Sequence, residues 1–334
     1  MKDKLGICSL LISLICAGFA CAETADTRLF VSNEYGASLS VIEVGSNKSR
    51  MLNVSARPGE VRPRGMAISL DGNTVYTAIS DFFPNSEKLE DAIVAVDVAS
   101  GEIIRSYSAG GNPERLAISP DGTQIWAALE AVAMAVGIDA ETGVELGRFP
   151  TGVEPEGVDV SPDGAYVYVT GETSHTISVI DARSLKLVTH FLVGNRPRDV
   201  AFSADGKHAY ATAEIGGSVS VIDVQRHQVV ETIQLGLDSR PVEIDISPDG
   251  KYAFVAGGGT NAVYVIDTIN RKVANVIKER MGRRPWGISV GPNGDFVYTA
   301  NGLSDSVSVI STDCMCVVEQ IQAGRGAHSI EVGG

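Results

Sequence analysis

The stretch Pro155-Glu156-Gly157-Val158-Asp159-Val160-Ser161-Pro162-Asp163-Gly164 occurs six times, with small changes, in this chain of 334 residues. Each copy is a short apolar run that ends in a tight-turn dipeptide. The copies begin at Pro63, Pro113, Pro155, Pro197, Pro241 and Pro285. A repeat of 42 to 50 residues is typical of proteins built by stacking one supersecondary unit many times.

Each repeat contains four short runs rich in β-branched residues. In the third repeat the first run is followed by Val167-Tyr168-Val169-Thr170 and Ser178-Val179-Ile180-Asp181, and the fourth repeat closes with Val229-Val230-Glu231-Thr232-Ile233. Four such runs joined by turns predict a four-stranded antiparallel meander. A sheet that is apolar on both faces must be covered on both, so we expect the units to stack as the blades of a β-propeller.

The two ends of the chain decide the number of blades. Residues 29–32, 39–42 and 50–54 match strands two, three and four of a unit that lacks its first strand, and residues 328–332 match the missing strand. We therefore predict an all-β fold, a seven-bladed β-propeller of four-stranded antiparallel blades, as a single domain over residues 27–334. Pairing the C-terminal strand with the N-terminal strands would close the ring and remove its open edges.

The N-terminus has the pattern of a signal peptide over residues 1–22. Lys2 and Lys4 precede an apolar stretch, and Ala20-Cys21-Ala22 resembles a cleavage site. The pattern predicts a periplasmic or secreted protein, and attachment of lipid to Cys21 is the alternative. Because no later run is long and apolar enough to span a bilayer, we predict no transmembrane segment.

The charge and the cysteines restrict the partners. The formal net charge of −14 disfavours nucleic acid and anionic membranes, and we expect a monomer.

Cys314 and Cys316 remain after cleavage of the signal. Residues two apart in a strand lie about 6.5 Å apart, so we interpret the pair as two thiols, with a strained disulfide or a weak metal site as alternatives.

The repeat resembles the YVTN family of β-propellers. The resemblance rests on the Ser-Pro-Asp-Gly turns, the Ser-Val-Ile-Asp runs and the runs at residues 30–33 and 298–301. Residues 153–157, 213–223 and 299–304 are similar to the branch associated with pyrroloquinoline quinone (PQQ)-dependent alcohol oxidation. That resemblance implies a periplasmic accessory propeller whose partner is a quinoprotein dehydrogenase or its cytochrome.

The loops that enter the innermost strands carry most of the candidate site. Strand parity places them, together with the loops between strands two and three, around one mouth of the central channel. The candidate residues are Arg62, Arg64, Glu114, Glu154, Glu156, Arg196, Arg198, Arg240, Arg284, Trp286 and His328. They could bind a small anionic ligand or an acidic partner surface, or they could neutralise each other as ion pairs. We expect Arg196 and Arg198 to be exposed, so that their loss would cost little stability.

A second group of residues is predicted to face the channel deeper inside. The alternating position of the innermost strands reads Ala67, Ala117, Asp159, Ala201, Asp245, Ser289 and Glu331. The carboxylates Asp159, Asp245 and Glu331 could form a weak cation site for Ca²⁺. The alternative is a water-filled channel without any cofactor.

Catalytic motifs are nearly absent. The histidines lack metal-ligand spacing, and the chain has neither a nucleophile elbow nor a phosphate loop. We therefore interpret the protein as a non-catalytic binding or scaffold propeller. The alternatives are a lactonase-like hydrolase that uses His328 and Glu156 to activate water, and a purely structural surface protein.

Overall fold

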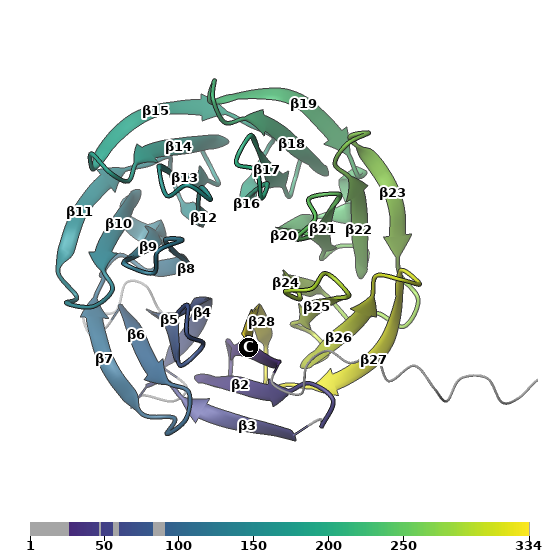
Figure 1. Cartoon of the computed structure of the whole chain (residues 1–334), viewed down its shortest axis with the longest axis horizontal. Coiled ribbons are helices and arrows are strands. Elements are labelled where there is room, and N and C mark those ends of the chain that lie inside the picture. Colours follow the sequence, from purple (N-terminus) through teal and green to yellow (C-terminus); the bar gives the residue numbers. More distant parts are fainter. Residues whose placement is uncertain (1–26, 47, 56–59, 83–90, 334) are drawn as a thin grey trace, which may run out of the picture.

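The computed structural model describes residues 27–46, 48–55, 60–82 and 91–333. Seven sheets of four antiparallel strands surround a central channel (Figure 1). This arrangement confirms the predicted fold. The predicted signal peptide lies outside the described residues, and none of the helices within them is long and apolar enough to cross a membrane.

Six blades are continuous in sequence, and their strands run from the channel outward. Blade 1 consists of β4 (Val61–Ile68), β5 (Thr74–Asp81), β6 (Ala92–Asp97) and β7 (Ile103–Ser108). Blade 2 consists of β8 (Pro113–Ile118), β9 (Gln124–Leu129), β10 (Met134–Asp139) and β11 (Glu145–Pro150), with a short 3₁₀ helix at Glu130–Val132. Blade 3 consists of β12 (Pro155–Val160), β13 (Tyr166–Gly171), β14 (Thr176–Asp181) and β15 (Lys186–Leu192). Blade 4 consists of β16 (Pro197–Phe202), β17 (His208–Ala213), β18 (Ser218–Asp223) and β19 (Gln228–Gln234). A second 3₁₀ helix at Leu237–Ser239 precedes blade 5, which consists of β20 (Pro241–Ile246), β21 (Tyr252–Gly257), β22 (Ala262–Asp267) and β23 (Lys272–Ile277). Blade 6 consists of β24 (Pro285–Val290), β25 (Phe296–Asn301), β26 (Ser306–Ser311) and β27 (Cys316–Gln322).

Blade 7 is shared between the two ends of the chain. It consists of β28 (Ala327–Gly333), β1 (Arg28–Asn33), β2 (Ser38–Glu43) and β3 (Lys48–Asn53), in that order. Val31 lies opposite Ile330 in the antiparallel register between β1 and β28. The closure therefore joins the last strand to the first, as the repeat count predicts.

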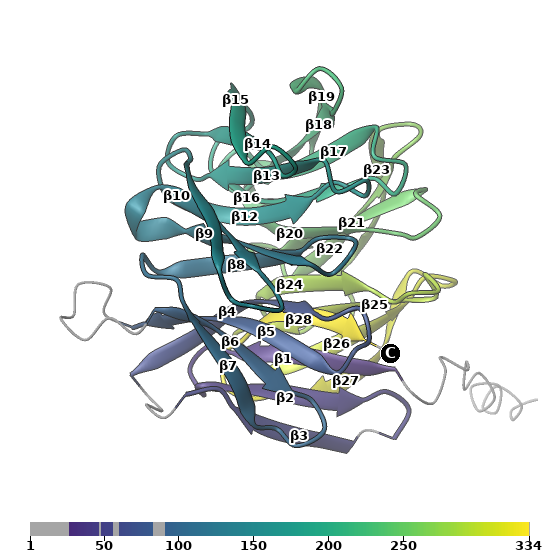
Figure 2. The same ribbon diagram turned by 60° about the vertical axis from the view of Figure 1, so that its left-hand side comes forward.

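The core lies between blades. Among the described residues there is one buried apolar cluster at each of the seven interfaces between neighbouring sheets. Trp126, which is completely buried, contacts Phe149 with 5.5 Å between ring centroids and belongs to the cluster between blades 2 and 3. Figure 2 shows the blades following one another around the ring. Each sheet thus has both faces covered, and no blade has a core of its own.

A β-bulge near the start of the innermost strands brings more side chains to the channel. In blade 3, Pro155 pairs with Gly171, but regular pairing resumes only at Val158 and Val169. A bulge re-aims the side chains beside it. The residue after the proline, or after Ala327 in blade 7, forms a mouth layer of Arg64, Glu114, Glu156, Arg198, Val242, Trp286 and His328. The next residue forms a middle layer of Gly65, Arg115, Gly157, Asp199, Glu243, Gly287 and Ser329.

The interpretation of Cys314 and Cys316 as free thiols is wrong. The structure joins them in a disulfide, with 5.3 Å between their Cα atoms. The distance of about 6.5 Å expected from the sequence assumed that both cysteines lie in an extended strand. Cys314 instead lies in the turn before β27, where Met315 adopts a left-handed conformation with φ 49° and shortens the distance.

We expect removal of residues 327–334 to destabilise the protein severely. Without β28, the inner edge of β1 is unpaired, and the apolar cluster between blades 6 and 7 loses Ala327 and Ile330. Thermal unfolding followed by circular dichroism measures the effect. A truncated protein that melts within a few degrees of the full chain would show that closure by β28 is dispensable.

Candidate functional site

One loop conformation positions the residues at the channel mouth. The residue before the strand-one proline is left-handed in blades 2 to 6, and these residues are Asn112, Glu154, Arg196, Arg240 and Arg284. In each of these blades, the carbonyl of the residue before the proline accepts a hydrogen bond from the residue that follows strand two. An example is Glu214 N to Arg196 O at 2.8 Å. The entry loop and the loop between strands two and three are therefore held together on one face.

The first charge cluster spans blades 7, 1 and 2. Arg64 donates from Nε to Glu114 at 2.5 Å and from Nη1 to Glu34 at 2.8 Å. Arg62 reaches the same two carboxylates at 3.4 Å each. Asn112 donates to Glu114 at 3.2 Å. The cluster is a closed network in which each arginine contacts both carboxylates.

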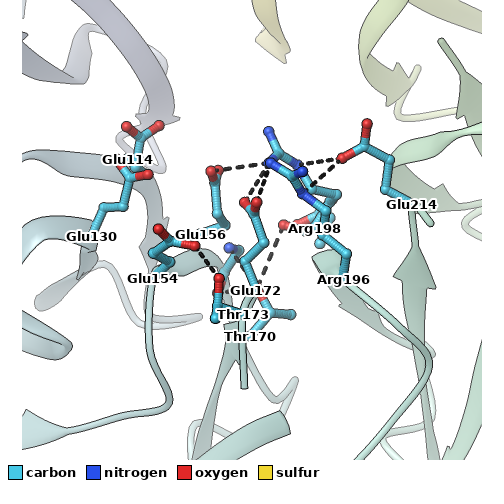
Figure 3. A network of polar contacts seen from close by, with 12 residues as sticks. Glu114, Glu130, Glu154, Glu156, Thr170, Glu172, Thr173, Arg196, Arg198 and Glu214 are labelled. Carbon is cyan, nitrogen blue, oxygen red and sulfur yellow. Dashed lines mark hydrogen bonds and ion pairs between the residues drawn. The ribbon is translucent and has the colours of Figure 1, made fainter. Parts of the chain in front are cut away.

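The second charge cluster spans blades 3 and 4 (Figure 3). Arg198 contacts Glu156 at 3.2 Å and forms a close ion pair with Glu172. Arg196 also pairs with Glu172 and lies 3.2 Å from Glu214. The Arg198 side chain is only 7% exposed, whereas that of Arg196 is 41% exposed. The expectation that both arginines are exposed is therefore wrong for Arg198, because its entry strand places it inside the mouth layer.

Burial separates the proton affinities of the carboxylates in these clusters. Burial raises the pKa of Glu114 to about 8 and the pKa of Glu172 to about 7. Burial also acts to raise the pKa of Glu156, but Arg198 and Arg64 bring that pKa below its usual value. Neighbouring carboxyl groups with pKa values pushed apart are a recurrent acid–base arrangement. Glu156 is the ionised member, and Glu172 is the one that holds a proton more readily.

His328 and Trp286 form the uncharged side of the mouth layer. His328 is 9% exposed, and neither of its ring nitrogens has a hydrogen-bond partner among the residues that the structure describes. Burial, together with the charges of Arg64 and Arg198, places the pKa of His328 well below its ordinary value, so the imidazole is neutral. The rings of Trp286 and His328 lie 5.3 Å apart. The guanidinium of Arg198 lies 5.0 Å from the Trp286 ring centroid.

Two hollows adjoin this imidazole. A cavity of about 190 Å³ opens at the mouth between blades 6 and 7, and its lining includes Tyr35, Arg64, Arg284, Trp286, Leu303 and His328. A smaller space below it is bordered by Glu156, Arg198 and His328. The imidazole therefore borders both the open cavity and the buried acid–base cluster.

Arg115 crosses the channel in the middle layer. It contacts Asp199 at 3.3 Å and forms a close ion pair with Glu243, so it links blades 2, 4 and 5. Burial raises the pKa of Glu243 to about 7. This guanidinium lies between the mouth and the deeper part of the channel.

The deeper part of the channel holds the carboxylates predicted as a cation site. All seven predicted positions line one cavity of about 310 Å³. Asp159 and Asp245 accept backbone N–H groups from the next blade, from Phe202 at 3.0 Å and Val290 at 2.8 Å. In the part of the chain that the structure describes, no three acidic, histidine or cysteine side chains converge as metal ligands. The Ca²⁺ site stays a prediction, and two of its carboxylates have a structural role.

The predicted mouth residues fall into three groups. Arg62, Arg64, Glu114, Glu156, Arg196, Arg198, Trp286 and His328 come together around the upper channel. Glu154 lies apart from the ion-pair network and accepts a hydrogen bond from Thr173 (Figure 3). Arg240 and Arg284 are exposed and line a second pocket at the rim, and Arg284 also lines the mouth cavity.

The sequence analysis missed the glutamates that pair with these arginines. Glu34, Glu172 and Glu214 each follow strand two of their blade directly. Glu130 has the same position in blade 2 and accepts a hydrogen bond from Asn112. The signal was available, because strand parity already placed these loops at the mouth. Arg115, Asp199 and Glu243 were missed because the repeat has glycine at their position in other blades, and only the bulge turns that position toward the channel.

Comparison with known proteins gives one match to a family model. Residues 187–316 match the lactonase family of seven-bladed β-propellers. The matched range contains Arg196, Arg198, Arg240, Arg284 and Trp286, but neither Glu156 nor His328. No curated protein matches the chain in sequence.

Several solved structures share the fold. Hydrazine synthase of Kuenenia stuttgartiensis is 22% identical, with a TM-score of 0.70 over 80% of this chain and 88% of that one. A protein of unknown function from Desulfotomaculum acetoxidans is 14% identical, with a TM-score of 0.77 over 91% of this chain and 98% of that one. A Bacteroides fragilis protein provisionally described as a 6-phosphogluconolactonase is 17% identical, with a TM-score of 0.73 over 94% and 99%. At these identities the likeness concerns the fold.

The match to the lactonase model contradicts the interpretation as a non-catalytic scaffold propeller. That interpretation rested on the absence of short catalytic motifs. A propeller site is assembled from one residue of each of several blades, so no short motif can carry it. The hydrolase alternative is the better supported of the two.

We expect Arg198→Ala to lower the free energy of unfolding by about 3 to 5 kcal/mol, because it leaves buried carboxylates without their counter-ion. Arg196→Ala is the matched control, since its side chain is 41% exposed and should cost at most about 1 kcal/mol. Urea denaturation of both variants measures the difference. Similar losses from the two substitutions would contradict the burial argument.

We expect Glu331→Gln to stabilise the protein at high pH. Burial in the channel raises the pKa of Glu331 to about 8, so the folded protein holds a proton that the unfolded chain has released. The wild type therefore loses stability as the pH rises toward 8, and the variant does not. A gain on the order of 1 kcal/mol at pH 8 that vanishes near pH 5 is expected from denaturant titrations. An equal effect of Glu331→Gln at both pH values would contradict the raised pKa of Glu331. The substitution Glu141→Gln, at an exposed position, serves as the control.

Proposed function

We propose that this protein is a hydrolase of lactones whose site is the mouth layer around His328. The observation that carries the proposal is a buried neutral imidazole, next to Glu156 and Arg198, whose ring nitrogens have no hydrogen-bond partner within the described part of the chain. A buried polar group without a partner costs free energy and calls for an explanation. A bound substrate that supplies the missing partners is such an explanation, and the lactonase match over residues 187–316 supports it.

The substrate would bind in the mouth cavity between blades 6 and 7. Trp286 and Tyr35 line this cavity, and flat aromatic faces suit the ring of a lactone. Bound there, the lactone carbonyl lies within reach of the imidazole that borders the cavity.

Hydrolysis adds water to the lactone carbonyl and breaks the ring C–O bond, which yields a hydroxy acid. In our proposal Glu156 accepts a proton from the attacking water, because its lowered pKa keeps it ionised. That proton passes to the departing ring oxygen. The neutral His328 donates its N–H to the carbonyl oxygen as negative charge develops there, and Arg64 and Arg198 stabilise this charge electrostatically.

We also propose that the protein is exported, on the strength of the signal pattern at residues 1–22. The YVTN repeat and the PQQ-associated branch stay predictions from the resemblance.

Acid release from a panel of five- and six-membered lactones, followed in a weakly buffered indicator assay, tests the activity. We expect His328→Ala and Glu156→Gln each to lower kcat/KM by about 10²-fold or more, because each removes a group that acts on the reacting atoms. His190→Ala, on the outer strand β15, is the matched histidine control and should match the wild type. A wild-type protein that releases no acid above background, or a His328→Ala variant with full activity, would overturn the proposal.

A further inference from the structure

The deeper part of the channel contains a cavity that the proposed hydrolysis does not use. This basal cavity has a volume of about 310 Å³ and is lined by the second halves of the innermost strands. Arg115 borders it on the side of the mouth. Ile68, Ile118 and Val332 border its other end, where they are partly exposed. A ligand would therefore enter from the face opposite the mouth.

The basal cavity carries an excess of negative charge. Asp159, Asp245 and Glu331 line it, and Arg115 is the one cationic side chain among the described residues of its lining. That guanidinium is already paired with two carboxylates of the middle layer. Burial, together with the carboxylates of Glu243 and Asp245, raises the pKa of Glu331 to about 8. A bound cation would remove the cost of ionising these buried groups.

Bridging between neighbouring blades does not account for these acids. Asp159 and Asp245 each accept an N–H group from the next blade. The same position is alanine in blades 1, 2 and 4, however, and the ring closes there without a carboxylate. Glu331 has no hydrogen-bond or ion-pair partner among the residues that the structure describes. Ionised carboxylates have about four lone-pair sites, so all three acids can still accept hydrogen bonds from a ligand.

A serine is a separate indication of a ligand. Ser289 has the same alternating position in blade 6, lines the basal cavity and is only 7% exposed. Its hydroxyl has no hydrogen-bond partner within the described ranges of the chain. A buried polar group without a partner calls for an explanation. A hydroxyl oxygen accepts hydrogen bonds as carboxylates do, so the cavity presents acceptors from four blades to a ligand that donates.

The spacing of the carboxylates indicates which kind of cation fits. They come from blades 3, 5 and 7, so at least one other blade lies between any two of them. Over the described residues, no three acidic, histidine or cysteine side chains converge as metal ligands. A single small ion would therefore reach only part of this ring, whereas a ligand with two cationic ends reaches two walls. The intervening blades present the apolar side chains of Ala67, Ala117 and Ala201, which suit methylene groups.

We propose that the basal cavity binds a short alkyl diamine. Its two ammonium groups lie against carboxylates of different blades and form charge-assisted hydrogen bonds with them. One ammonium group also donates to the Ser289 hydroxyl, and the methylene chain lies along the alanine side chains between the acids. This site is separated from the mouth layer by Arg115, so it does not depend on the proposed hydrolysis of lactones.

Isothermal titration calorimetry tests the site without any assay of hydrolysis. 1,4-Diaminobutane, 1-aminobutane and calcium chloride are titrated separately at constant ionic strength and at about pH 8.5, where the three carboxylates are largely ionised. We expect saturable binding of the diamine, at least tenfold tighter than binding of the monoamine. The reason is that the second ammonium group pairs with a carboxylate of another blade.

Two variants and one matched control locate the site. Asp159→Asn/Asp245→Asn/Glu331→Gln should weaken binding of the diamine at least tenfold. Glu331→Gln alone should weaken it severalfold, and this variant removes no hydrogen bond between described residues. The control Asp163→Asn/Asp205→Asn/Asp249→Asn removes three exposed carboxylates from the turns between strands one and two. It changes the net charge by the same amount and should bind like the wild type.

Several results would overturn the diamine site. One is a wild-type protein that shows no saturable binding of 1,4-diaminobutane, or that binds 1-aminobutane equally well. Another is unchanged affinity in Glu331→Gln or an equal loss in the control variant, which would reduce the effect to overall charge. Saturable binding of calcium alone would assign the carboxylates to a metal ion instead. The hydrolysis of lactones is tested separately by His328→Ala, so the two proposals can fail independently.

Discussion

The structure depends on one constraint, which is that each sheet has apolar side chains on both faces and can be covered only by another such sheet. The seven interface clusters satisfy this constraint around a closed ring. Closure leaves the inner edges of seven strands facing one channel, where their backbone N–H groups need acceptors. Carboxylates meet part of that need, because Asp159, Asp199 and Asp245 each accept an N–H group from the innermost strand of the next blade, at 3.0, 3.1 and 2.8 Å. These three acidic side chains therefore help to join neighbouring innermost strands.

Charge is unevenly distributed among the blades at the mouth of the channel. Blades 7, 1, 2, 3 and 4 bring arginines and glutamates into contact across blade boundaries. Blades 5 and 6 have Gly258 and Gly302 where their neighbours have glutamate, and the pockets lie there. The mouth is thus divided into a part in which the charges are paired and an open, positively charged part. Trp286 stands at the boundary between them.

Burial gives the mouth layer its chemical character. In water, Glu156, Glu172 and Glu114 would have nearly the same pKa, whereas here their pKa values are separated by desolvation and by the arginines beside them. His328 is kept neutral by the same two causes, and this leaves it one N–H to donate and one lone pair to accept. A hydrolytic site needs an ionised base, a donor for the carbonyl oxygen and fixed positive charge, and these occur together in one layer of the ring.

The sequence by itself determined the fold, the number of blades and the closure, because the period of the repeat and the missing first strand depend only on the order of residues along the chain. It also placed Glu156, Arg198 and His328 at one mouth, since strand parity fixes which loops share a face. Only the tertiary structure decided which charges are paired. Arg196 and Arg284 both precede a strand-one proline, but only Arg196 is paired, because the preceding blade presents Glu172 to Arg196 and Gly258 to Arg284. Likewise Arg115 reaches the channel through a bulge that the repeat does not mark, and Cys314 meets Cys316 through a left-handed turn residue. Contacts between residues far apart in the chain, and local departures from regular strand geometry, carry no periodic signal in the sequence.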